Sequence, residues 1–226
     1  GDVSEHPELI DVHGSQRGIP AFWNHGNSID YNADLDQIVL SARGFNEIWV
    51  IDHATTTEEA AGPAGDLLWR WGNPIAHQNG QREDRQLFQQ HDAQWIPVNC
   101  PGAGNMLIFN NGLDRGFSSV IEIKPPVDGN GRYSRYDAPI VWEYRADPPE
   151  TFYSSEISGA HRLPNGNTVM SNWLGHGRIG TAPHLIEVTR DKKVVWTFSD
   201  HKTMRTIASV QLMDVEGDAT KGEILH

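Results

Sequence analysis

Short apolar or alternating segments, separated by turn residues, recur along the whole chain. Near its start the pattern predicts three strands, at residues 27–31, 37–43 and 46–52, joined by an Asn-Ala-Asp turn and a glycine. Strands of this length with turns so close together are typical of an antiparallel meander. A meander returns the end of its second strand to the start of its first, so we expect residues 25–27 and residue 43 to meet at one edge of a sheet.

The same pattern then repeats. Each unit is expected to hold a Trp-bearing strand, a His-led strand, a Gly-Asn turn into an apolar strand, and a strand ending near Ile-Glu-Val or Ile-Asp. His25, His91 and His161 take equivalent places in this scheme, with spacings of 66 and 70 residues. The tryptophans that recur in step with it are expected to pack between units: Trp69, Trp142 and Trp196.

Units of four short strands with a period of about 40 to 50 residues predict an all-β fold, the β-propeller. Residues 1–20 are a polar, turn-rich lead-in, and residues 21–226 are expected to form about three and a half blades, the last opening at Lys193 and closing near Val215. Propellers close with about 4 to 8 blades, which protects their strand edges. We therefore expect this chain to be the C-terminal part of a larger propeller, completed by a missing N-terminal segment or by a partner chain.

Composition narrows the class of partner. The 226 residues suffice for one domain with a sizeable core, and 22 glycines and 13 prolines suit a loop-rich β fold. A net charge of -12 makes nucleic acid and anionic membranes poor partners, and no long apolar run predicts membrane insertion. The single cysteine, Cys100, excludes an intrachain disulfide.

Because the net charge is negative, any anion site must be built from local positive groups, against the electrostatic field of the whole protein.

The predicted sheet edge is the first candidate for such a site. His25, Asn27 and Arg43 combine an imidazole, an amide donor and a fixed guanidinium, which together suit a tetrahedral oxyanion. The structural alternatives are that each histidine only caps a turn, that three of them only mark the repeat, and that Arg43 is a surface charge.

A metal site is not expected. The spacing of His53, His176, His184 and His201 fits no standard ligand pattern. The aspartates near residue 34 lack the glycine and the terminal glutamate of a calcium loop and are better explained as turn formers. No cofactor is expected either.

The order and spacing of six segments together resemble the bacterial arylsulfotransferase family, the aryl-sulfate sulfotransferases that use no nucleotide sulfate donor. The segments are residues 25–32, 36–43, 46–53, 72–74, 90–95 and 163–168. The resemblance covers nearly the whole chain from about residue 21. It implies a six-bladed propeller with its active site at the central channel, and an exported protein, periplasmic or extracellular.

The resemblance also implies a reaction and a set of residues. A histidine takes the sulfuryl group from an aryl sulfate and passes it to a phenol in a ping-pong sequence. His91 matches the histidine that becomes sulfated, while His25, Asn27 and Arg43 match the sulfate-binding set, with His25 and Arg43 in catalytic roles. Asp92 is a candidate to orient the His91 ring, although neighbours on a strand usually point to opposite faces.

Three further residues are candidates for substrate contact. Trp23 and Trp95 lie next to site residues and are candidates to stack on an aromatic acceptor, and His161 is expected to line the channel. Two other readings stay open: a non-catalytic propeller that serves as a scaffold or binding subunit, and a lectin-like binder with tryptophans on its rim. Convergence of His25, Asn27, Arg43 and His91 around one anion-sized space would favour the enzyme.

Overall fold

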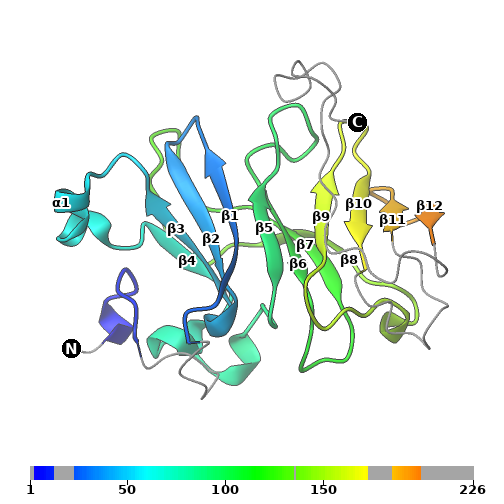
Figure 1. Ribbon diagram of the computed structural model, residues 1–226, viewed down its shortest axis with the longest axis horizontal. Helices are drawn as coiled ribbons and strands as arrows, with labels where there is room; N and C mark the ends of the chain where they lie inside the picture. The colour runs from blue at the N-terminus through cyan, green and yellow to red at the C-terminus, as the bar shows by residue number, and fades with distance from the viewer. Residues whose placement is uncertain (1–2, 13–22, 135, 173–184, 200–226) are drawn as a thin grey trace, which may run out of the picture.

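The structure is a computed structural model that describes residues 3–12, 23–134, 136–172 and 185–199. In this part of the chain the strands form three antiparallel sheets that stand side by side (Figure 1). Each sheet has four strands, taken in chain order from one side of the sheet to the other. The fold is therefore all-β and built from repeated four-stranded blades, as the pattern predicted.

The strands of the first sheet are β1 (Gly26–Asn32), β2 (Gln37–Ala42), β3 (Glu47–Asp52) and β4 (Trp69–Trp71). Those of the second are β5 (His91–Trp95), β6 (Met106–Asn110), β7 (Ser119–Ile123) and β8 (Ile140–Tyr144). Those of the third are β9 (Gly159–Arg162), β10 (Thr168–Ser171), β11 (Leu185–Val188) and β12 (Val194–Phe198).

Helical structure is short and confined to the connections. The one α-helix of the described residues is α1 (Thr57–Ala60), which begins with a capping box between Thr56 and Glu59. The remaining helices are single 3-10 turns: η1 (Val3–Glu5), η3 (Arg43–Phe45), η4 (Pro63–Gly65), η5 (Pro74–His77), η6 (Arg82–Asp84) and η7 (Pro149–Thr151).

The strand with which each blade ends differs from the sequence prediction. The Trp-bearing strands β4, β8 and β12 end their sheets instead of opening them. Each pairs with the strand that precedes it in the chain, as Glu122 with Trp142 and Glu187 with Trp196 show. Pairing between strands that are consecutive in the chain explains this order. Val194–Phe198, which pairs with β11, therefore belongs to the third blade and does not open a fourth. The expected closing strand near Val215 lies outside the described residues.

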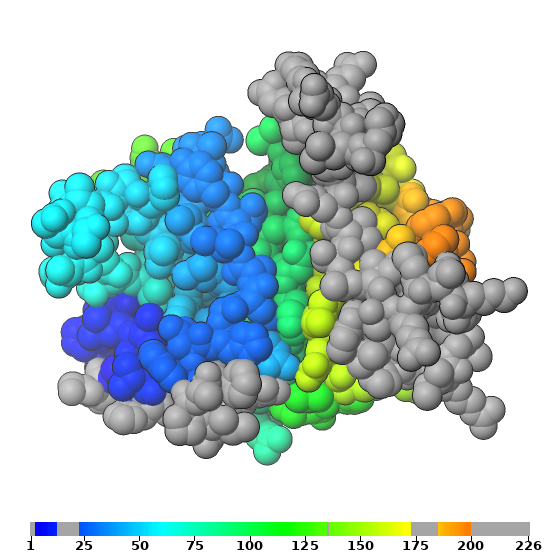
Figure 2. All heavy atoms as spheres, viewed as in Figure 1, coloured from blue at the N-terminus to red at the C-terminus, as the bar shows by residue number. Residues whose placement is uncertain are grey.

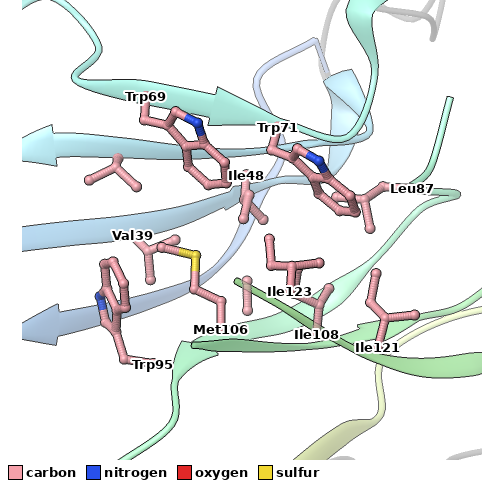
Figure 3. Close-up of a cluster of buried hydrophobic side chains, with 12 residues drawn as sticks. Val39, Ile48, Trp69, Trp71, Leu87, Trp95, Met106, Ile108, Ile121 and Ile123 are labelled. Atoms are coloured by element: carbon pink, nitrogen blue, oxygen red, sulfur yellow. The ribbon is translucent and has the colours of Figure 1, made fainter. Parts of the chain in front are cut away.

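Apolar side chains fill the space between neighbouring sheets. The first cluster joins sheets one and two (Figure 3): Val39, Ile48, Val50, Trp69, Trp71, Leu87, Ala93, Trp95, Met106, Ile108, Ile121 and Ile123. A second cluster joins sheets two and three and includes Trp142. Trp69 and Trp142 thus pack between blades as predicted. Trp196 differs, with 46% of its surface exposed, because no described sheet covers the third one.

Side chains also tie the first strands of adjacent sheets together, and β1 and β5 lie in contact in the space-filling view (Figure 2). The backbone N–H groups of Ala93 and Trp95 donate to Ser28 Oγ at 2.9 Å and to Asp30 Oδ2 at 2.8 Å. The N–H of Ala160 donates to Asp92 Oδ2 at 2.8 Å in the same way. These bonds satisfy edge groups that would otherwise lack partners. The first two fix β5 against β1, and the third fixes β9 against β5.

Candidate active site

The end of the first sheet brings His25 and Arg43 together as the meander predicted. Gly26 pairs with Ala42, and the backbone N–H of Gly44 donates to the His25 carbonyl oxygen at 3.4 Å. Arg43 begins η3 directly after β2, and only 3% of its surface is exposed. A guanidinium this buried is held by the fold and is not a mobile surface charge.

His91 faces the same place from the second sheet. It opens β5, and the residue before it, Gln90, accepts a hydrogen bond at its carbonyl oxygen from Asn27 Nδ2 at 2.8 Å. Burial lowers the pKa of His91 to about 4, and the positive charges of Arg43 and His25 act in the same direction. Because Asn27 and Ser41 both bond to Gln90, the segments that carry His25, Asn27, Arg43 and His91 meet where the first two sheets adjoin.

Both ring nitrogens of His91 have partners that the sequence did not reveal. Nδ1 lies 2.8 Å from Oδ1 of Asn111, and the backbone N–H of Ile157 donates to Nε2 at 3.2 Å. Asn111 follows β6 in an Asn-Asn-Gly turn, which reads from the sequence as a turn signal only. Its role depends on pairing between distant segments, which no local motif encodes.

The suggestion that Asp92 orients His91 is wrong. The Asp92 carboxylate accepts from the Ala160 N–H and lies 3.9 Å from His161 Nε2, so it faces the third sheet. Burial raises its pKa. Asp92 has a positive φ of 54° beside a β-bulge between His91 and Gln94, and its side chain points away from the His91 ring, as neighbours on a strand usually do.

His161 does not occupy the place that His91 has. It is the third residue of β9, whereas His91 is the first of β5, and its described ionic neighbour is Asp92. The longer sequence spacing, 70 residues against 66, was the sign of this shift. Its position supports a link between the second and third blades.

The two candidate tryptophans have different surroundings. Trp95 is 6% exposed and its ring packs in the cluster between the first two sheets, near Val39 and Met106 (Figure 3). We therefore assign Trp95 to the core. Trp23 is 39% exposed and meets the edge of Phe45, with ring centroids 6.2 Å apart. Phe45 closes η3, the turn that Arg43 opens, so Trp23 lies beside this turn.

The donor set suits an anion more than a metal. No group of three or more His, Cys, Asp or Glu in the described ranges is arranged to hold a metal ion. A neutral imidazole beside a fixed guanidinium can attack an electrophile while the guanidinium holds its negative oxygens.

None of the helices in the described ranges is long and apolar enough to cross a membrane.

Comparison with known proteins places the chain in a family. No protein with a curated description matches the chain. A solved structure, described as a protein of unknown function from Bacteroides caccae, is 15% identical, covers 82% of this chain and 85% of its own, and has a TM-score of 0.28. This likeness is too weak to support a conclusion about fold or function. The family model described as Arylsulfotransferase (ASST) matches residues 9–197, which is most of the chain. The chain belongs to the arylsulfotransferase family.

Proposed function

We propose that this protein moves a sulfuryl group from an aryl sulfate to a phenolic acceptor, through a ping-pong sequence in which His91 is transiently sulfated. Membership of the arylsulfotransferase family supports aryl sulfotransfer. The observation that carries the finer proposal is the position of the half-buried His91, directly after Gln90, whose carbonyl oxygen accepts from Asn27 Nδ2 at 2.8 Å. Burial lowers the pKa of His91 to about 4, so its ring is neutral near pH 7.

The first half-reaction forms a bond between a His91 ring nitrogen and sulfur. The bond between sulfur and the aryl oxygen breaks, and its electron pair leaves on the phenolate. Sulfuryl transfer resembles phosphoryl transfer in that charge spreads over the equatorial oxygens, so catalysis depends on positioning and electrostatic stabilisation. Arg43 holds those oxygens, Asn27 lies beside them, and His25 supplies a proton to the phenolate.

The second half-reaction reverses the roles. The acceptor phenol attacks sulfur, the bond between sulfur and His91 breaks, and the ring nitrogen recovers its lone pair. The phenol proton returns to His25. We propose that Trp23, which is exposed beside η3, stacks on the acceptor ring. Both substrates are small molecules, and we propose a periplasmic or extracellular location, which is usual for the family.

The test uses the native protein, with any segments beyond these 226 residues. It is incubated with 4-nitrophenyl sulfate with and without phenol, quenched, and mapped by peptide mass spectrometry. We expect a sulfuryl adduct on the His91 peptide, about one equivalent of nitrophenolate released without phenol, and continued release only when phenol is present. His91→Gln should lose both. His53→Gln, which changes a histidine bonded to Asp36, should keep both. Absence of adduct and turnover in the native protein would favour a scaffold or binding role.

A further inference from the structure

We infer that Asn111 is a positioning residue that presents Nε2 of His91, and not Nδ1, as the nitrogen that attacks sulfur. This inference rests on the proposed function and adds to it the attacking atom and the group that selects it. Asn111 itself is fully buried at the end of β6 and touches the ring directly.

The orientation of the Asn111 amide is fixed by two carbonyl groups. Its Nδ2 donates to the backbone oxygens of Ser154 at 2.8 Å and Ile157 at 2.9 Å. The amide oxygen is therefore the atom that lies 2.8 Å from Nδ1 of His91. Because an amide oxygen only accepts hydrogen bonds, Nδ1 must carry the ring proton in the neutral imidazole.

A second contact leads independently to the same tautomer. The backbone N–H of Ile157 lies 3.2 Å from Nε2, and a backbone N–H only donates, so Nε2 must hold the lone pair. The contact is long for a hydrogen bond and correspondingly easy to give up. Ile157 and Ser158 have positive φ values of 53° and 72°, which are uncommon for such residues. A sulfuryl group on Nε2 displaces this N–H.

The neutral amide also suits the second half-reaction. Attack through Nε2 leaves the proton on Nδ1, so the intermediate is a sulfated imidazolium with a positive ring and a negative sulfonate. Asn111 accepts from that Nδ1–H without adding a full negative charge. A carboxylate there would stabilise the positive ring more strongly, raise the pKa of His91, and make the ring a poorer leaving group.

The experiment compares the wild-type protein with Asn111→Asp and with Asn110→Asp. Asn110 is the matched control, because it is equally buried and bonds to Phe88 and Gln86 instead of His91. Nitrogen-15 NMR of histidine-labelled resting wild-type protein should show the Nδ1–H tautomer of His91, and the trapped adduct should be on Nε2. Asn111→Asp should move the acid limb of kcat/KM upward by about one pH unit or more and slow desulfation about tenfold. Asn110→Asp should change neither.

The outcomes separate this inference from the proposed function. An Nε2–H tautomer, an adduct on Nδ1, or an unchanged acid limb in folded Asn111→Asp would overturn the role of Asn111 while His91 sulfation stands. Absence of any His91 adduct would instead overturn the function. If Asn111→Asp does not fold, the wild-type tautomer and the adducted nitrogen still decide the matter.

Discussion

At the residue scale, the surroundings of His91 keep its ring neutral. Burial is the main reason why its pKa falls from 6.5 to about 4, and the charges of Arg43 and His25 add to the effect. The hydrogen bond with Asn111 opposes them by raising the pKa. The ring is therefore neutral over the range in which a free histidine would become charged, which keeps its lone pair available.

This pKa makes folding stability depend on pH. The folded-state pKa of His91 lies below the unfolded value, so the unfolded state binds the proton first as the pH falls, and stability decreases between about pH 6.5 and pH 4. Proton binding by His91 in the unfolded state should lower the free energy of unfolding by about 2 kcal/mol between pH 7 and pH 5. Urea unfolding at both pH values should show that loss in the wild type and its absence in His91→Asn. Equal losses in the two proteins would contradict the assignment.

Arg43 should be needed for its shape as well as its charge. Arg43→Ala removes the guanidinium that we propose grips the sulfuryl oxygens, and kcat/KM should fall about 10²- to 10³-fold. Arg43→Lys keeps a charge but loses the fork of donors, and an intermediate loss of about tenfold or more is expected. Arg132→Ala, an exposed arginine in a loop, is the control and should stay within about twofold of the wild type. Steady-state kinetics with an aryl sulfate measures all three, and an unaffected Arg43→Ala would remove Arg43 from the site.

At the element scale, the turn after β6 supports Asn111. Gly112 follows it with a φ of 73°, and a Cβ at that position would clash with the backbone oxygen of Phe117. Gly116, in the same connection, has a φ of 76° but no atom within 4 Å of such a Cβ. The two glycines therefore separate the effect of backbone conformation from that of a backbone clash.

Gly112→Ala should destabilise the protein far more than Gly116→Ala. The second change costs the conformational penalty alone, about 1 kcal/mol. The first must also move the chain at Phe117, and a loss above about 3 kcal/mol is expected. Because Asn111 adjoins the disturbed turn, sulfation of His91 should fall as well. Chemical unfolding of the two variants measures the difference, and equal losses would show that the turn adapts.

The sequence predicted the elements that local pattern determines. Alternating apolar residues and turn signals located the three strands of the first meander, and antiparallel geometry then placed His25 beside Arg43. The phase of the blades was wrong because period alone does not say which strand ends a sheet. The partners of His91 were missed because they come from segments 20 and 66 residues away. The β-bulge between His91 and Gln94 likewise has no local signature.

At the scale of the whole molecule, the site exists only because two blades are held in register. Arg43 and His25 belong to the first sheet and His91 to the second. Between them, side chains of β1 bond to the backbone of Gln90, directly before β5, and of Ala93 and Trp95 in β5. The apolar cluster stabilises the contact between the two sheets but is not directional. The hydrogen bonds fix the position of one strand along the other.

Asp30 is the clearest test of this arrangement. Its carboxylate accepts the Trp95 N–H at 2.8 Å, and Asp30→Ala leaves that buried donor unpaired, which should cost about 1–3 kcal/mol. Asp34→Ala, in the exposed turn after β1, should cost less than about 0.5 kcal/mol. A shift of β5 also moves His91 relative to Arg43, so Asp30→Ala should lower kcat/KM at temperatures where the variant is fully folded, while Asp34→Ala should not. If Asp30→Ala loses stability but keeps wild-type kinetics, the blades are held in register by the apolar cluster alone, and the bonds between β1 and β5 serve only to satisfy the strand edge.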